Sequence, residues 1–147
     1  MITPAPTSKI DPALARGTLV ETVAATATRP EFVKISFPNT SYEMHLLPAG
    51  PVSALPGKRI IGTIRARARR IDITQTGGRF IEPVYGRPRR VQGTVVVIDP
   101  GNNAVVVDAS VPIHCTPTDP RQKASDFQVG QFVGFDVMEG ATFTQAR

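Results

Sequence analysis

The chain has 147 residues, 41% of them hydrophobic and 20% charged, and its formal net charge at pH 7 is +5. This length suits one globular domain that buries its own core without metal ions or disulfides. A single cysteine, Cys115, excludes an internal disulfide, and one cysteine with two histidines cannot supply a zinc site of the cysteine and histidine type. We therefore expect no metal and no cofactor, and a Cys115 side chain that is buried rather than nucleophilic.

Two features of the sequence argue against membrane contact and secretion. Apolar runs such as 95–98 are far shorter than a membrane span requires. Glu21 interrupts the apolar run 19–25, so this region lacks the continuous apolar core of a secretory signal. The sequence therefore predicts a cytoplasmic protein.

Positive charge is concentrated in one third of the chain. Residues 58–90 contain ten basic and two acidic residues, a local charge of +8, whereas the remaining seven basic and ten acidic residues give −3. Such clustering is typical of a surface that binds nucleic acid or another polyanion, although the solvated face of a strand has the same composition.

Residues 1–29 are rich in Thr, Ala and Pro and contain no aromatic residue. This composition buries little apolar surface, and it predicts a flexible N-terminal tail before a single β-barrel domain over 30–147. A docked strand at 18–23 is the alternative interpretation.

Alternating apolar and polar residues over 31–46, interrupted by Pro38-Asn39-Thr40, predict a β-hairpin. The alternation places His45 on the polar side, where we expect a solvated imidazole. The sequence leaves open whether residues 31–56 complete the barrel or form a separate layer.

The stretch 60–71 has apolar or small residues at even positions up to 68, while Arg65, Arg67 and Arg69 take odd positions. After Arg70 the phase reverses, because the next isoleucines lie at odd positions. A strand with a β-bulge at 69–70 explains both halves. A helical stripe fits the same isoleucines. The Ile and Thr content and the internal Gly62 favour the strand.

The next segments read as strands and turns. Pro83 confines the segment 79–85 to a sheet edge, because proline donates no backbone hydrogen bond. Apolar and polar residues alternate over 90–97, and the turn Asp99-Pro100-Gly101-Asn102-Asn103 then leads into the segment 104–115, which predicts a second hairpin.

The C-terminal part begins with a helix signal. The segment 119–127 has Asp at the N-cap, Pro at the first helical position and Gln three residues after the cap, which predicts one short helix. Alternation over 131–138 and a short apolar segment at 142–144 predict two final strands.

This order of elements resembles the OB-fold, and three stretches over about residues 90–145 resemble the cold-shock domain: GTV at 93–95, VPIH at 111–114 and FQVGQFVGFDVMEG at 127–140. The resemblance implies an all-β fold, a small OB-like Greek-key barrel with an extra N-terminal hairpin and one short helix. The stretch GGRFIEPVYGRPRRVQGTV also resembles bacterial proteins of this length, which implies no activity.

Cold-shock domains stack bases on aromatic residues of their second and third strands. Here the segment 103–107 has no aromatic residue and Pro112 occupies an expected aromatic position, so only His114 carries over as a base contact. The remaining mode of nucleic-acid binding is contact between arginine side chains and phosphates, because the planar guanidinium group fits a phosphate.

We therefore predict a non-enzymatic binding module whose partner is nucleic acid or another polyanion. The sequence has no nucleophile-elbow motif and no phosphate-binding loop, and neighbouring His114 and Cys115 point to opposite faces of a strand. Guanidinium groups from two strands expected to be neighbours would form one wall. The predicted site residues are Arg65, Arg67, Arg69, Arg70, Arg89, Arg90 and His114.

Two other readings stay open. In the first, the barrel is a structural protein that forms homo-oligomers or docks to a larger protein through its edge strands. In the second, the barrel mouth binds a small molecule, for which the sequence offers no polar cluster.

Overall fold

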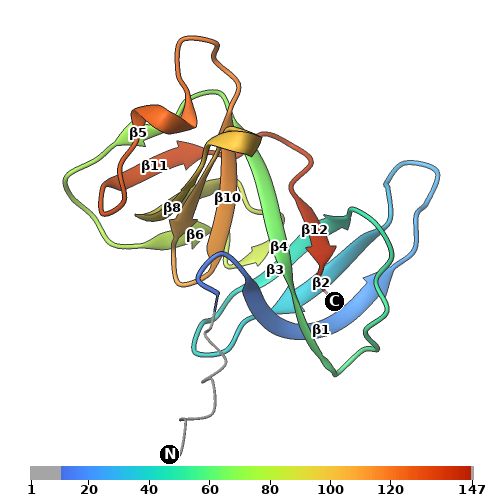
Figure 1. Cartoon of the computed structure of the whole chain (residues 1–147). Helices are drawn as coiled ribbons and strands as arrows, with labels where there is room; N and C mark the ends of the chain where they lie inside the picture. The colour runs from blue at the N-terminus through green and yellow to red at the C-terminus, as the bar shows by residue number, and fades with distance from the viewer. Residues whose placement is uncertain (1–10, 147) are drawn as a thin grey trace, which may run out of the picture.

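The structure, a computed structural model, describes residues 11–146 and confirms the predicted all-β class, with a closed barrel that is consistent with an OB-like fold. Five strands form a closed ring in the order β1-β2-β3-β12-β4, with β4 pairing back to β1 (Figure 1). β3 and β12 are parallel, and the other neighbours in the ring are antiparallel. The ring strands are β1 (Ala15–Val23), β2 (Phe32–Ser36), β3 (Glu43–Pro48), β4 (Arg59–Ala68) and β12 (Thr142–Gln145).

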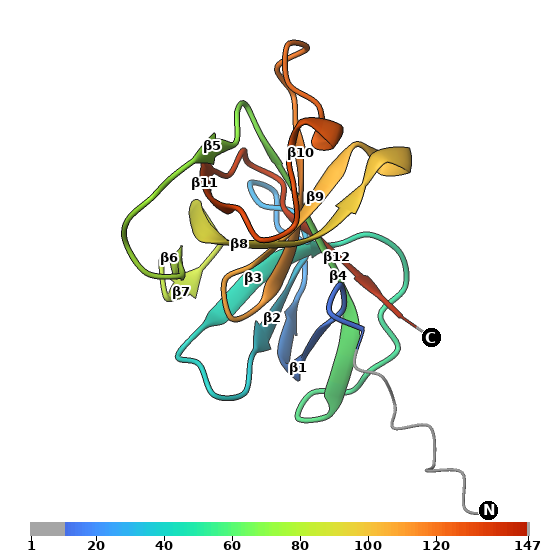
Figure 2. The ribbon, with the colours of Figure 1, turned by 60° about the vertical axis from the view of Figure 1, so that its left-hand side comes forward.

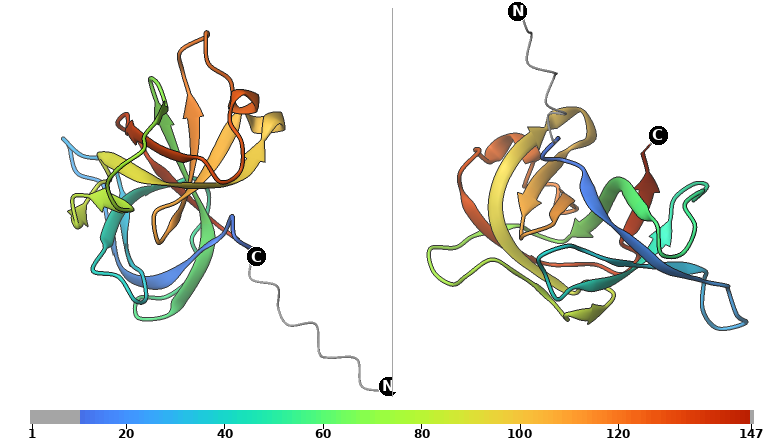
Figure 3. Two further views of the ribbon diagram at one scale, coloured as in Figure 1. Left: turned by 90° about the vertical axis from the view of Figure 1, so that its left-hand side faces the viewer. Right: turned by 90° about the horizontal axis from the view of Figure 1, so that it is seen from below.

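A second sheet continues from β4 in the order β4-β10-β9-β8-β11-β5, and β6 pairs with β8. The left-hand view of Figure 3 shows its yellow and orange strands above the blue and cyan strands of the ring. Its strands are β5 (Asp72–Ile73), β6 (Phe80–Glu82), β8 (Arg90–Asp99), β9 (Ala104–Asp108), β10 (Pro112–Pro117) and β11 (Phe132–Asp136), with the 3₁₀ helices η1 (Pro100–Asn102) and η2 (Ala124–Asp126) between them. The short strand β7 (Tyr85–Gly86) pairs instead with β3 of the ring.

Strand β4 belongs to both sheets, and its alternation explains how. The even-numbered side chains from Ile60 to Ala68 are buried, and Arg65 and Arg67 point outward. One edge of β4 pairs first with β1 and then with β10, while the other edge pairs with β12. The strand interpretation of this stretch is confirmed, and the helical alternative is wrong.

The phase reversal after Arg70 has a different cause from the predicted β-bulge. β4 ends at Ala68 and β5 begins at Asp72, so the strand is interrupted between them. The side chain of Gln122 bridges the gap: its Oε1 accepts a hydrogen bond from the Ile71 N–H at 2.7 Å, and its Nε2 donates to the Ile71 carbonyl at 2.8 Å. These bonds replace ladder partners that an interrupted strand lacks.

The same Gln122 explains why the predicted helix over 119–127 is wrong. Its side chain is engaged with Ile71 instead of reaching back to the helix cap. Asp119 therefore caps only a turn, accepting the Arg121 N–H at 2.9 Å, and the helical part shrinks to η2.

The prediction of a flexible tail over 1–29 is wrong for residues 15–23, which form β1, and residues 1–10 lie outside the described region. β1 is held by β2 on one edge and by β4 on the other. The alternative interpretation, a docked strand at 18–23, is correct, although the strand begins earlier, at Ala15. β2 and β3, the predicted hairpin, also belong to the ring, which settles the place of residues 31–56.

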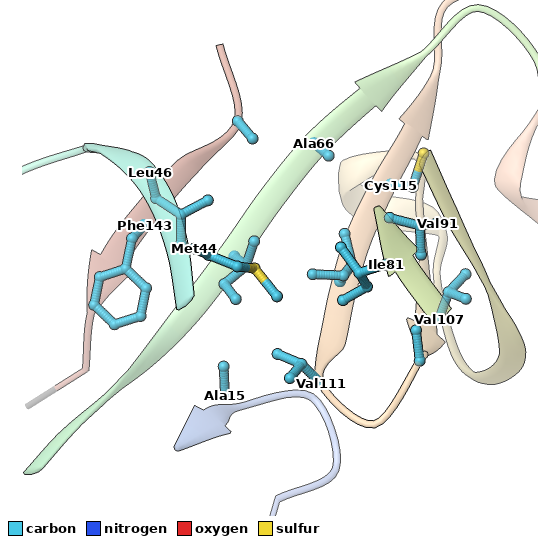
Figure 4. Packing of buried hydrophobic residues seen from close by; sticks show 14 of the residues in the cluster. Ala15, Met44, Leu46, Ala66, Ile81, Val91, Val107, Val111, Cys115 and Phe143 are labelled. Atoms are coloured by element: carbon cyan, nitrogen blue, oxygen red, sulfur yellow. The ribbon is translucent and has the colours of Figure 1, made fainter. Parts of the chain in front are cut away.

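The buried apolar side chains form one cluster that spans both sheets. Figure 4 shows Phe143 and Leu46 on the ring side, Val91 and Val107 on the other, and Met44 between them. Cys115 lies in this cluster, as predicted, and burial raises the pKa of its thiol. Among residues 11–146, no helix is long and apolar enough to cross a membrane.

Candidate functional site

Three aromatic rings gather on the outer face of β2 and β3. The Phe32 ring stacks on the His45 ring, with centroids 4.9 Å apart and an interplanar angle of 28°. Tyr85 meets the same His45 ring edge-on at a centroid distance of 4.8 Å. Tyr85 is 57% exposed and Phe32 is half-buried, so ring surface remains open to solvent. We call Phe32, His45 and Tyr85 the aromatic cluster.

Strand register brings these rings together. Lys34 of β2 lies opposite His45 of β3, and Phe32 shares the Lys34 face because side chains two apart in a strand point the same way. Tyr85 arrives from a distant part of the sequence, since β7 pairs in parallel with β3 and places Tyr85 opposite Glu43. Figure 2 shows β7 beside β3, where the ring meets the second sheet.

Three cations surround the aromatic cluster. The Arg29 guanidinium carbon lies 5.0 Å from the centroid of the Phe32 ring. The Lys34 ammonium lies 5.7 Å from the centroid of the Tyr85 ring and donates a hydrogen bond to the Tyr85 hydroxyl at 3.1 Å. Hydrogen bonds with Tyr85 and Glu21 raise the pKa of Lys34, so its charge persists at neutral pH. Arg87 forms an exposed ion pair with Glu139 at 2.8 Å.

The His45 ring is an uncharged platform within this cationic setting. Burial, followed by the nearby Lys34 charge, lowers the pKa of His45 below its ordinary value of 6.5. Its Nε2 atom is buried and has no hydrogen-bond partner among the described residues. At neutral pH the imidazole is therefore neutral, and it supports Phe32 by stacking rather than by charge.

The rings and cations line a groove of about 480 Å³, whose remaining apolar lining includes Leu47 and Ala141. A groove of this size with aromatic walls and cationic rims suits a planar, anionic ligand, because rings stack and ammonium or guanidinium groups bind phosphate.

The predicted arginine residues do not form one wall. β4 and β8 are not neighbours, because β10 and β9 lie between them in the sheet, so that expectation is wrong. Arg89 and Arg90 instead line a shallow hollow of about 650 Å³ that shares Tyr85 and Arg87 with the groove.

The other predicted arginines lie along β4 and at its C-terminal end. Arg65 is exposed and lies opposite His114 of β10, while Arg67 donates a 3.5 Å hydrogen bond to the Glu139 carbonyl. Arg69 and Arg70 follow β4, and Arg70 pairs with Asp119 at 3.4 Å. Asp119 is itself held mainly by a hydrogen bond from Arg121, which lowers the pKa of the carboxyl.

His114, the predicted base contact, is 7% exposed. Its Nε2 atom lies 2.7 Å from the Ala13 carbonyl oxygen, so the segment before β1 covers the ring. Burial lowers the pKa of His114, with a smaller contribution from Arg65. This geometry leaves His114 little surface for stacking on a base.

The sequence-based prediction missed the aromatic cluster, although it contained one signal. Phe32 lies on the polar face of an alternating strand, together with Lys34, where a large apolar ring has no core to fill. His45 is likewise packed between rings instead of being solvated as expected. Tyr85 carried no comparable signal, because its position depends on the pairing of β7 with β3.

The lowered pKa values of His45 and His114 lead us to expect that the protein loses stability on acidification. Because their pKa values are lower in the folded protein than the ordinary value of 6.5, the unfolded chain binds these protons more readily. The contribution of the two neutral histidines to the free energy of unfolding is complete above pH 6.5, and it is lost as the pH falls from 6.5 towards their pKa values in the folded protein. We expect the melting temperature to fall between about pH 7.5 and pH 5, and to fall less in His45→Phe and His114→Gln variants. Equal pH dependence in all three proteins would contradict this assignment.

Comparisons with protein-family models, with curated proteins and with solved structures find no match for this chain. The functional conclusion therefore rests on the geometry and charge of the groove.

Proposed function

We propose that this protein is a non-enzymatic module that binds single-stranded nucleic acid on the outer face of β2 and β3. The observation that carries the proposal is the aromatic cluster with Arg29, Lys34 and Arg87 around one groove. Exposed rings stack bases of any sequence, at about 1–3 kcal/mol per base, and the cations neutralise the phosphates between them.

The charge of the groove favours this ligand class over two others. A quaternary ammonium or methylated lysine also binds aromatic rings, but the groove keeps an excess of positive charge that disfavours a cation, because Lys34 and Arg87 pair with Glu21 and Glu139 while Arg29 forms no ion pair within 4.0 Å among the described residues. Duplex DNA covers its bases, so the rings could not stack on them. A single strand offers both exposed base faces and negative charge.

The position of the groove supports the proposal by analogy. OB-like barrels bind oligonucleotides on the face of their second and third strands, and β2 and β3 hold those places in this ring. A shared architecture does not assign a function, so the specific support comes from the side chains. The net charge of +5 adds long-range attraction for a polyanion.

Fluorescence anisotropy with a labelled oligothymidine of about 12 nucleotides tests the proposal, with salt varied from about 50 to 300 mM. We expect micromolar affinity at low salt. If three phosphates are neutralised, log K should fall with log salt at a slope of about −2. No anisotropy change at low salt, or binding confined to duplex, would refute the proposal. A defined oligomer in light scattering without any affinity would support the assembly reading instead.

A further inference from the structure

We infer that the nucleic-acid binding site continues beyond the aromatic cluster onto a patch formed by Arg87, Arg89 and Arg90. This patch binds further phosphates of the same oligonucleotide. This inference rests on the proposed function and extends it to the second sheet. We call these three residues the arginine patch.

Three neighbouring hollows form the continuous surface that the inference requires. The groove of about 480 Å³ shares Arg87, Glu139 and two neighbouring residues with a smaller hollow of about 210 Å³. The hollow of about 650 Å³ shares Arg87 and Tyr85 with the groove, and Arg87 and Arg89 with the smaller hollow. Arg87 therefore borders all three, and a strand bound at the rings would meet it next.

The backbone of Arg89 and Arg90 in the arginine patch is held in place from two sides. The Arg89 N–H donates to the Glu82 carbonyl at 2.7 Å, and the Arg89 carbonyl accepts from the Val137 N–H at 2.8 Å. Arg90 lies in β8 opposite Glu82 and Asp136. The side chains of Arg89 and Arg90 thus project from a fixed backbone, which reduces the backbone entropy lost when a ligand binds.

The acids in this region do not prevent phosphate binding. Arg87 and Arg90 pair with Glu139 and Asp136, whose side chains are 86% and 85% exposed. Exposed ion pairs contribute little, so a bidentate phosphate contact can replace them. Arg89 is exposed and has no carboxylate within 4.0 Å among the described residues.

The chemistry of the two regions differs. Tyr85 is the only aromatic residue lining the hollow of about 650 Å³ within the described part of the chain. The arginine patch therefore offers phosphate contacts without further stacking, and it can act only on a ligand long enough to cross Tyr85. The ligand class is a single strand of several nucleotides rather than a mononucleotide.

Oligothymidines of about 3 and about 12 nucleotides separate the two regions. We expect Arg89→Ala to weaken binding of the long oligonucleotide roughly fivefold, to reduce the magnitude of its salt slope by about 0.7, and to leave binding of the short one unchanged. Arg69→Ala, which removes an exposed arginine outside the three hollows, should change neither. Arg89→Lys should retain most of the salt slope.

Three results would overturn the inference. The first is an Arg89→Ala protein that binds the long oligonucleotide as tightly as the Arg69→Ala protein does. The second is an Arg89→Ala protein whose affinity for the short and the long oligonucleotide falls by the same factor. If the wild-type protein binds neither length, the proposed function itself fails. Thermal melting checks that each variant is folded. If Arg89→Ala does not fold, a folded Arg89→Gln protein replaces it, and the same loss of long-oligonucleotide binding is expected.

Discussion

Replacing Gly62 with alanine is expected to destabilise the protein by about 3 kcal/mol or more, because β4 has no room for a side chain at this position. A Cβ atom there would collide with the Thr144 carbonyl oxygen and would lie 2.5 Å from the Phe143 ring. Thr144 contributes rigid backbone from β12, so neither strand can yield without weakening the ring closure. Urea denaturation measures this loss.

Gly78→Ala is the matched control, because a Cβ atom there meets nothing within 4 Å and the residue is exposed in the connection between β5 and β6. We expect its stability to stay within about 0.5 kcal/mol of the wild type. A Gly62→Ala protein as stable as the Gly78→Ala protein would show that β4 and β12 do not pack as described.

Removing the rings is expected to have the largest effect on binding. Phe32→Ala and Tyr85→Ala should each weaken the binding of an oligothymidine about ten- to hundredfold, because each loses one stacking surface. Both side chains lie on the outer face, so melting temperatures should change little. Phe32→Tyr keeps a ring and should retain most of the affinity.

Arg65→Ala is the control for the competing surface along β4. Arg65 is exposed and is not among the residues that line the groove. We expect a loss of less than about threefold, from reduced long-range attraction alone. A larger loss for Arg65→Ala than for Phe32→Ala in anisotropy titrations would place the ligand on β4 instead.

Alternation and turn chemistry predicted most local structure correctly. β2, β3, β4 and the first part of β8 follow apolar and polar alternation, and each hairpin turns at an asparagine with positive φ, 62° at Asn39 and 48° at Asn103. Asparagine tolerates this conformation better than most residues, so the turn residues could be identified without a structure.

β1 was only the alternative interpretation of its segment, because two of its three inward positions, Ala15 and Gly17, are small and only Leu19 is a large apolar residue. A Cβ atom on Gly17 would lie 2.5 Å from the Ser36 carbonyl oxygen and 2.7 Å from the Ile35 side chain, so close approach of β2 requires glycine. The inward Ala15 is small as well. In sequence, such residues look like a flexible segment, whereas in the ring they allow strands to approach.

The candidate site depends on pairings between distant segments, which local patterns do not encode. β12 closes the ring beside β3 and β4, and β7 brings Tyr85 to His45. The arginine run was visible in the sequence, but its division between β4 and β8 follows from the strand order. Composition therefore indicated a polyanion, while topology determines which cations lie beside aromatic rings.

Mapping of the bound oligonucleotide by amide chemical shifts in two-dimensional NMR tests the central claim most directly. The proposal predicts that an oligothymidine shifts the amides of residues 29–34, 43–47 and 84–90, which surround the aromatic cluster and the arginine patch. Shifts confined to residues 59–70 and 112–117, or no shifts at saturating oligonucleotide, would contradict it.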